Sequence, residues 1–184
     1  MHKIMLPTLA ALATAAFFLA FKPATESHLF KGDPPGTIQA IGNAGSDQVF
    51  TFEKWEFTKA EMEEGKVETL ELEAVIDCKS LACDWKDLEK SVKKKESYFN
   101  VSKFPTAKVV IKGAEDQGDG TWLTNAELTL KKTTKEVPLT FTIGDEKPYQ
   151  VKGSGELKRR KFGFDGGGPK NEVPISFDMT LPIK

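Results

Sequence analysis

Cysteine and histidine are scarce in this chain, with two of each among 184 residues. His2 lies at the N-terminus and His28 lies in a stretch rich in glycine and proline, so soft ligands are too few for a structural zinc site. A Ser-His-Asp triad would depend on His28, which that stretch would not hold in place. The sequence also lacks a Gly-x-x-x-x-Gly-Lys-Ser/Thr phosphate loop, a His-Glu-x-x-His helix and a Gly-x-Ser-x-Gly elbow. We therefore expect no catalytic residues, no metal and no cofactor, and we do not expect an enzyme.

An excess of charge of either sign is also missing. The chain has 26 Lys and Arg and 27 Asp and Glu, and the two signs are interspersed. A nucleic-acid interface would need a basic face or stripe, so we expect no nucleic-acid partner. Residues 116–120 are rich in Asp but lack the ligand spacing and closing glutamate of an EF-hand loop, and we interpret them as a turn.

The N-terminal segment has the order of an export signal. Met1-His2-Lys3 precedes an apolar run over residues 4–21, and Lys22 and Pro23 follow it. We expect a signal peptide over residues 1–24, processed between about Ala20 and Ser27, and a periplasmic or secreted protein. An uncleaved membrane anchor is the alternative, because the run reaches the lower length limit for a membrane span. No cysteine follows the run closely, which excludes a lipoprotein linkage at that point.

Cys78 and Cys83 both lie beyond the export segment, and export to an oxidising compartment favours a disulfide between them. Two unpaired thiols are the alternative. A third hypothesis is a thiol redox module, which would require an exposed thiol of low pKa, and Cys83 just ahead of an expected helix is its candidate.

Alternation of apolar and polar residues dominates the chain after a tether with a first short strand over residues 25–46. Leu70, Leu72, Ala74 and Ile76 alternate with charged neighbours, which is typical of a strand with one buried face. The same period predicts about eight strands. They cover residues 37–41, 49–58, 70–78, 107–111, 122–130, 137–143, 149–157 and 173–183.

The connections predict an antiparallel meander. Residues 116–120, 144–147 and 165–169 have hairpin chemistry, and only residues 84–96 have helical spacing, with Trp85, Leu88 and Val92 expected on one face. Parallel strands would need more crossover helices. We therefore predict an all-β fold, an antiparallel eight-stranded β-barrel over residues 47–184 with one short helix. At about eight strands, the interior is either filled by side chains or wide enough for one slender ligand.

Three motifs occur in order along the domain. The first is Ser97-Tyr98-Phe99-Asn100-Val101-Ser102-Lys103-Phe104-Pro105-Thr106-Ala107-Lys108-Val109-Val110-Ile111. The second runs over residues 126–139 and the third is Arg160-Lys161-Phe162-Gly163-Phe164. Together they resemble the pattern of the YceI-like family over roughly residues 67–182. Lys132 stands where that family usually has a glycine, and residues 49–58 lack its usual histidine.

The resemblance implies a lipocalin-like barrel whose apolar lumen holds an isoprenoid-type lipid, either an isoprenoid quinone or a polyprenyl phosphate, with transient membrane contact. Together with the shared alternation, it predicts that the ligand contacts Leu72, Ile76, Val109, Ile111, Trp122, Leu128, Phe141, Tyr149, Val151, Phe177 and Met179. Arg159 and Arg160 are candidate head-group contacts, although a basic run on a strand also protects a sheet edge. The alternative function is a structural or protein-interaction barrel that its own thirteen phenylalanines fill.

Overall fold

A computed structural model describes residues 30, 32–43, 46–167 and 170–183, so the expected signal segment lies outside the described residues. The fold is all-β with a single α-helix in this part of the chain, α1 (Lys86–Lys94), and two short 3₁₀ turns, η1 (Cys78–Ser80) and η2 (Arg159–Phe162). The strands are β1 (Gly36–Asn43), β2 (Asp47–Phe52), β3 (Trp55–Glu63), β4 (Lys66–Asp77), β5 (Leu81–Ala82), β6 (Thr106–Lys112), β7 (Glu115–Asp116), β8 (Trp122–Leu130), β9 (Thr133–Ile143), β10 (Gln150–Lys158) and β11 (Glu172–Thr180).

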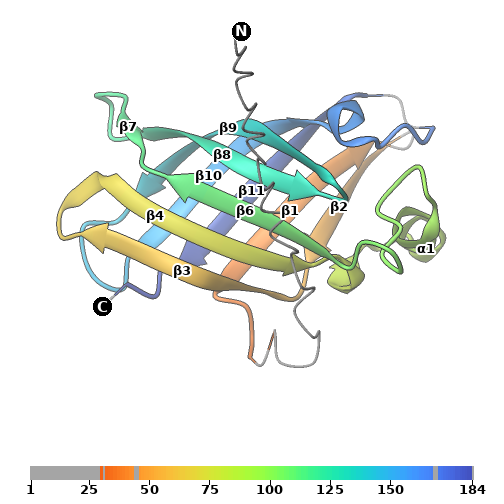
Figure 1. The fold of residues 1–184 in the computed structure, drawn as a ribbon, viewed down its shortest axis with the longest axis horizontal. Helices are drawn as coiled ribbons and strands as arrows, with labels where there is room; N and C mark the ends of the chain where they lie inside the picture. The colour runs from red at the N-terminus through yellow and green to blue at the C-terminus, as the bar shows by residue number, and fades with distance from the viewer. Residues whose placement is uncertain (1–29, 31, 44–45, 168–169, 184) are drawn as a thin grey trace, which may run out of the picture.

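All strands belong to one antiparallel sheet with the order β3-β4-β6-β8-β9-β10-β11-β1-β2-β5, and β7 pairs with β8. The sheet curls so that β3, β4, β6 and β8 cross in front of β10, β11 and β1 (Figure 1). Only two residues separate β2, which pairs with β1, from β3, which pairs with β4, so the two ends of the sheet meet there. Among the described strands β3 pairs with β4 alone, and the barrel is open along its other edge. If β2 and β3 are counted as one bent strand, the sheet contains eight long strands, which is the number that the alternation predicts.

The bend between β2 and β3 explains why residues 49–58 are apolar at both even-numbered and odd-numbered positions. Phe50 and Phe52 are buried on β2, whereas Trp55 on β3 is buried and Phe57 is half-buried. The inward parity therefore changes by one residue at the bend. Because a strand reverses its faces with each one-residue shift, a single continuous strand could not bury both sets.

Elsewhere the alternation is regular. Val137, Leu139 and Phe141 are buried on β9, and the residues between them are exposed. The outer face carries cross-strand ion pairs such as Lys108 with Glu73, at 2.7 Å between Nζ and Oε2. Exposed pairs of this kind contribute about 0–1 kcal/mol, so the inward face supplies the main stabilisation of the sheet.

The two-residue turn between β8 and β9 consists of Lys131 and Lys132. Lys131 has the left-handed backbone, with φ at 56°, so the position that favours glycine is one residue earlier than the family pattern suggested. The Lys131 Nζ donates to the carbonyl oxygens of Glu96 at 2.7 Å and Gly163 at 3.1 Å. This side chain therefore ties the turn to the segment after α1 and to the end of η2.

Helix α1 is shorter than expected and presents Leu88 and Val92 to the barrel. Trp85 precedes the first helical turn and is 49% exposed, so the prediction that it shares the apolar face is wrong. The Glu89 carboxylate accepts hydrogen bonds from Lys93 Nζ at 2.7 Å and Lys86 Nζ at 2.9 Å, which lower the pKa of this carboxyl to about 2.

The predicted disulfide is wrong. Cys78 and Cys83 are both buried, free and outside disulfide distance. Cys78 begins η1 directly after β4, and its N–H donates to the Pro105 carbonyl at 2.7 Å, while β5 between the cysteines pairs with β2. Burial, aided by the charge of Asp77, raises the pKa of the Cys78 thiol to about 12. Neither cysteine provides the exposed thiol that the redox hypothesis requires.

Candidate ligand-binding site

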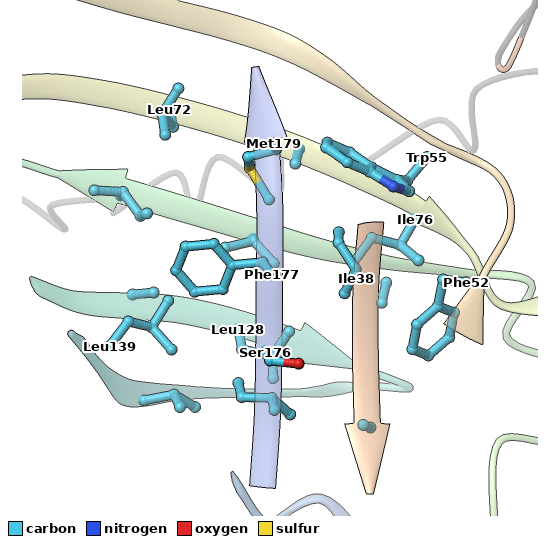
Figure 2. A pocket seen from close by; sticks show the side chains of 18 of the residues that line it. Ile38, Phe52, Trp55, Leu72, Ile76, Leu128, Leu139, Ser176, Phe177 and Met179 are labelled. Carbon is cyan, nitrogen blue, oxygen red and sulfur yellow. The ribbon is translucent and has the colours of Figure 1, made fainter. Parts of the chain in front are cut away.

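An apolar cavity of about 160 Å³ lies inside the barrel. Its walls come from β1, β3, β4, β6, β8, β9, β10 and β11, with Phe52 from β2 and Phe99 from the segment after α1. Among the described residues that line it, Gln39 and Ser176 alone are polar. Figure 2 shows Phe177 and Met179 of β11 and Ile38 of β1 in front of Leu72, Ile76 and Leu128 on the far strands.

The cavity brings together nine of the eleven residues that the sequence selected as ligand contacts. They are Leu72, Ile76, Val109, Ile111, Leu128, Phe141, Val151, Phe177 and Met179. Trp122 is half-buried and Tyr149 is buried, but neither lines the cavity, since both lie at the end of the barrel away from α1. The interior register assigned to β4, β6, β9 and β11 therefore agrees with the structure, and contact with a ligand remains a prediction.

Several lining residues were missed. Trp55 and Phe57 lie in the segment whose parity the bend obscures, and no local signal at Glu53 or Lys54 marks that bend. Leu139 and Ile175 share the inward alternation of residues that were selected, so the same signal could have included them.

The unfilled space borders several strands, β11 among them. Ile175, Phe177 and Met179 face inward but are only half-buried, whereas Val137, Leu139 and Phe141 of β9 are buried. Dispersion contacts are incomplete for side chains that border empty space, so these residues would gain contacts from an apolar ligand.

Gly153 and Gly155 on β10 allow two neighbouring side chains to lie close to the wall. A Cβ on Gly153 would overlap the Phe177 ring and lie 2.6 Å from the Thr140 carbonyl oxygen, and one on Gly155 would lie 2.6 Å from Leu139 Cδ2. A glycine inside a strand is typical either of a bend or of a place where a neighbour occupies the missing side-chain volume. The contacts favour the second, because the Phe177 ring occupies space that a side chain at position 153 would need.

A second cavity of about 150 Å³ lies towards α1 and shares wall residues with the first. The shared residues are Ala40, Phe52, Phe99, Leu130 and Leu157. Phe99 makes edge-to-face contacts with Phe52, at 5.9 Å between ring centroids, and with Phe164 at 4.8 Å. These rings form a partition between two compartments, and the second compartment also has polar wall residues, Asn43, Arg159, Lys170 and Glu172.

Arg159 lines the second cavity, but its guanidinium is buried and binds backbone. Nη1 donates to the carbonyl oxygens of Phe164 at 2.6 Å and Gly166 at 2.9 Å, and Nε donates to that of Lys170 at 2.8 Å. Arg159 therefore stabilises the connection between β10 and β11. Arg160 is exposed in η2, and because the basic run leaves the sheet after Lys158, it does not protect a strand edge.

Two further observations bear on the chemistry of the site. No group of three or more His, Cys, Asp or Glu side chains in the described part of the chain could hold a metal ion. Within the same residues, no helix combines the length and apolar composition needed to cross a bilayer.

The geometry defines a class of protein, a single antiparallel β-barrel with an apolar lumen. Within that class the chain belongs to the YceI-like domain family, whose model matches residues 26–181, which confirms the resemblance. It is 26% identical over 138 residues to a UPF0312 protein of Pseudomonas syringae pv. tomato, covering 71% of this chain and 70% of the relative.

Solved structures share the fold. BcnA of Burkholderia cenocepacia superimposes with a TM-score of 0.71 at 19% identity, covering 78% of this chain and 94% of BcnA. A polyisoprenoid binding domain from Saccharophagus degradans, implicated in plant cell wall breakdown, gives 0.60 at 11% identity, covering 80% of this chain and 94% of that domain. The YceI protein of Campylobacter jejuni gives 0.60 at 15% identity, covering 71% of this chain and 81% of that protein. These similarities confirm the predicted barrel fold.

Proposed function

We propose that this protein is an exported, non-enzymatic lipid-binding protein that holds one isoprenoid-type lipid in the barrel. An isoprenoid quinone and a polyprenyl phosphate are the two candidate ligands. The observation that carries the proposal is the cavity inside the barrel, whose lining is apolar except for Gln39 and Ser176.

The chemistry of this cavity suits a slender apolar chain. Its walls offer almost no hydrogen-bond partners, so a polar ligand would lose its hydration without compensation. Each buried CH₂ group of a lipid tail contributes about 0.8 kcal/mol, and affinity should therefore rise with chain length until the lumen is full. The Saccharophagus degradans protein that shares the fold is a polyisoprenoid binding domain, which supports the same ligand class here.

Export is the second part of the proposal. It is supported by the basic start and apolar run of residues 1–24, followed by a domain that matches the family model from residue 26. We place the mature protein in the periplasm or outside the cell. N-terminal sequencing of the protein recovered from cells tests this part, and an intact N-terminus in a washed membrane fraction would decide for an anchor.

Lipid extraction and mass spectrometry of natively purified protein test the ligand. We expect one isoprenoid lipid per barrel, and delipidated protein should bind prenyl quinones more tightly as the tail lengthens. Protein that carries no lipid and ignores prenyl quinones and polyprenyl phosphates at micromolar concentration would favour the self-filled structural barrel instead.

A further inference from the structure

The two ends of the barrel carry opposite charge. The connections at the end where α1 lies span residues 78–105, 131–132 and 159–171, and they contain thirteen Lys or Arg against five Asp or Glu. The connections at the opposite end span residues 64–65, 113–121 and 144–149, and they contain one Lys against six Asp or Glu. The near-neutral net charge of the chain, −1, therefore conceals a strongly dipolar molecule. Figure 1 shows α1 and η2 together at one end and β7 with the β3–β4 turn at the other.

Helix α1 presents a basic stripe outward. Lys86, Lys90 and Lys94 follow one another at intervals of four residues and are exposed, while Leu88 and Val92 on the other side line the second cavity. The Glu89 carboxylate pairs with Lys86 and Lys93. Within the described residues no carboxylate pairs with Lys90 or Lys94, so their charges face solvent.

Two large apolar side chains are exposed at the same end. Trp85, immediately before α1, is 49% exposed, and Val49 near the start of β2 is 48% exposed. An exposed indole beside lysines is typical of a segment that rests at a membrane interface, where tryptophan places its ring at the head-group level.

We propose that the α1 end of the barrel docks on an anionic lipid bilayer. A molecule of near-zero net charge can bind in this way if its basic end faces the membrane. The surface potential of the membrane acts over about a Debye length, and the acidic end of the barrel lies on the far side. A bilayer fits better than an acidic protein, since Trp85 suits the head-group region and the second cavity lies directly beneath α1. Docking itself does not depend on the proposed function. If that function holds, docking places the lumen where a lipid can pass between the membrane and the barrel.

Vesicle flotation with the protein as recovered from cells tests the docking. The vesicles contain phosphatidylcholine alone or with about a third phosphatidylglycerol, and the variants are Lys90→Glu with Lys94→Glu against Lys66→Glu with Lys112→Glu. Both double variants change the net charge equally, but the second lies towards the acidic end. Any binding through the apolar residues 4–21 would be the same for all variants and would also occur with neutral vesicles, so it can be subtracted.

We expect anionic vesicles alone to bind the native protein, and the α1 variant to bind them at least about 30-fold more weakly. That lower bound is the loss of ~1 kcal/mol for each of two lysines, converted at ~1.4 kcal/mol per factor of ten, and repulsion of the two new carboxylates weakens binding further. The control variant should bind as the native protein does, and Trp85→Ala should weaken binding at both low and high salt. Equal losses in the two double variants, or no binding to anionic vesicles, would overturn the docking proposal, the latter result favouring an acidic protein partner.

Prenyl-quinone binding in solution, measured on the same variants, separates the two proposals. The α1 variant should keep full quinone affinity, because Lys90 and Lys94 do not line either cavity. Retained quinone binding without docking refutes docking alone. Docking without binding of either prenyl quinones or polyprenyl phosphates refutes the lipid ligand alone.

Discussion

Replacing Gly153 by alanine tests the wall of the lumen most directly. Gly153 pairs with Phe177 on β11 and with Phe141 on β9, and a Cβ there would overlap the Phe177 ring and approach the Thr140 carbonyl oxygen to 2.6 Å. The ring can swing away, but the carbonyl belongs to the backbone of the neighbouring strand and must shift with it. Overpacking of this kind typically destabilises a protein by about 1–3 kcal/mol.

Gly144→Ala is the matched control. A Cβ on Gly144 would meet nothing closer than the Gln150 carbonyl oxygen at 3.7 Å, which is an ordinary contact. The same chemical change should then be neutral or stabilise by up to about 1 kcal/mol, because alanine restricts the unfolded chain. The urea midpoint of the Gly153→Ala protein should fall, whereas that of the Gly144→Ala protein should stay unchanged or rise.

The Gly153 variant also bears on function. Phe177 lines the cavity, and a ring displaced from the wall into that space would compete with the ligand, so prenyl-quinone affinity should fall more than the stability change explains. Phe177→Leu in the Gly153→Ala background should restore part of the lost stability. The loss that remains in the double variant should then come from the close contact with the Thr140 carbonyl oxygen. Equal unfolding midpoints for the Gly153→Ala and Gly144→Ala proteins would refute the close approach of Phe177 to β10.

Three further outcomes follow from single side chains. Phe141→Asp should lose about 3–5 kcal/mol or fail to fold, because it removes a buried ring and buries a carboxyl, whereas Thr140→Asp on the exposed face should change the unfolding midpoint little. Since the folded-state pKa of Glu89 is about 2, below its ordinary 4.5, the stability that it contributes is present above pH 4.5 and disappears as the pH falls towards 2. Glu89→Gln should therefore flatten the acid side of the stability profile. Cys78 should resist alkylation in the native protein at pH 8 and react once the chain unfolds.

The inward face of each regular strand could be predicted from the sequence because one face of the sheet is buried and the other is wet. On β4, β9 and β11 the alternation continues without interruption, and a register error would have exposed a whole apolar set. The alternation fails as a guide between β2 and β3, where the parity changes at Glu53 and Lys54. Such a bend results from closure of the barrel, which depends on strands distant in sequence.

The partners of Arg159 and of the two cysteines were harder to predict than the inward positions of apolar side chains. Arg159 belongs to a run of basic residues that looks solvated, yet its guanidinium is buried and donates to the backbone carbonyls of residues 164, 166 and 170. Expected export to an oxidising compartment suggested a disulfide between Cys78 and Cys83, but β5 between them pairs with β2. In both cases the partner is chosen by tertiary structure, and side-chain chemistry alone contains no information about it.

The dipolar charge arrangement is a consequence of the meander and could have been predicted from it. In an antiparallel meander successive connections lie at alternate ends of the strands. The basic connections 78–105, 131–132 and 159–171 alternate along the chain with the acidic connections 113–121 and 144–149. Net charge averages the two sets to near zero, and Lys or Arg residues follow one another directly only at residues 93–95, 131–132 and 158–161. Charge in such a fold should therefore be summed over alternate connections, as hydrophobicity is read over alternate residues of a strand.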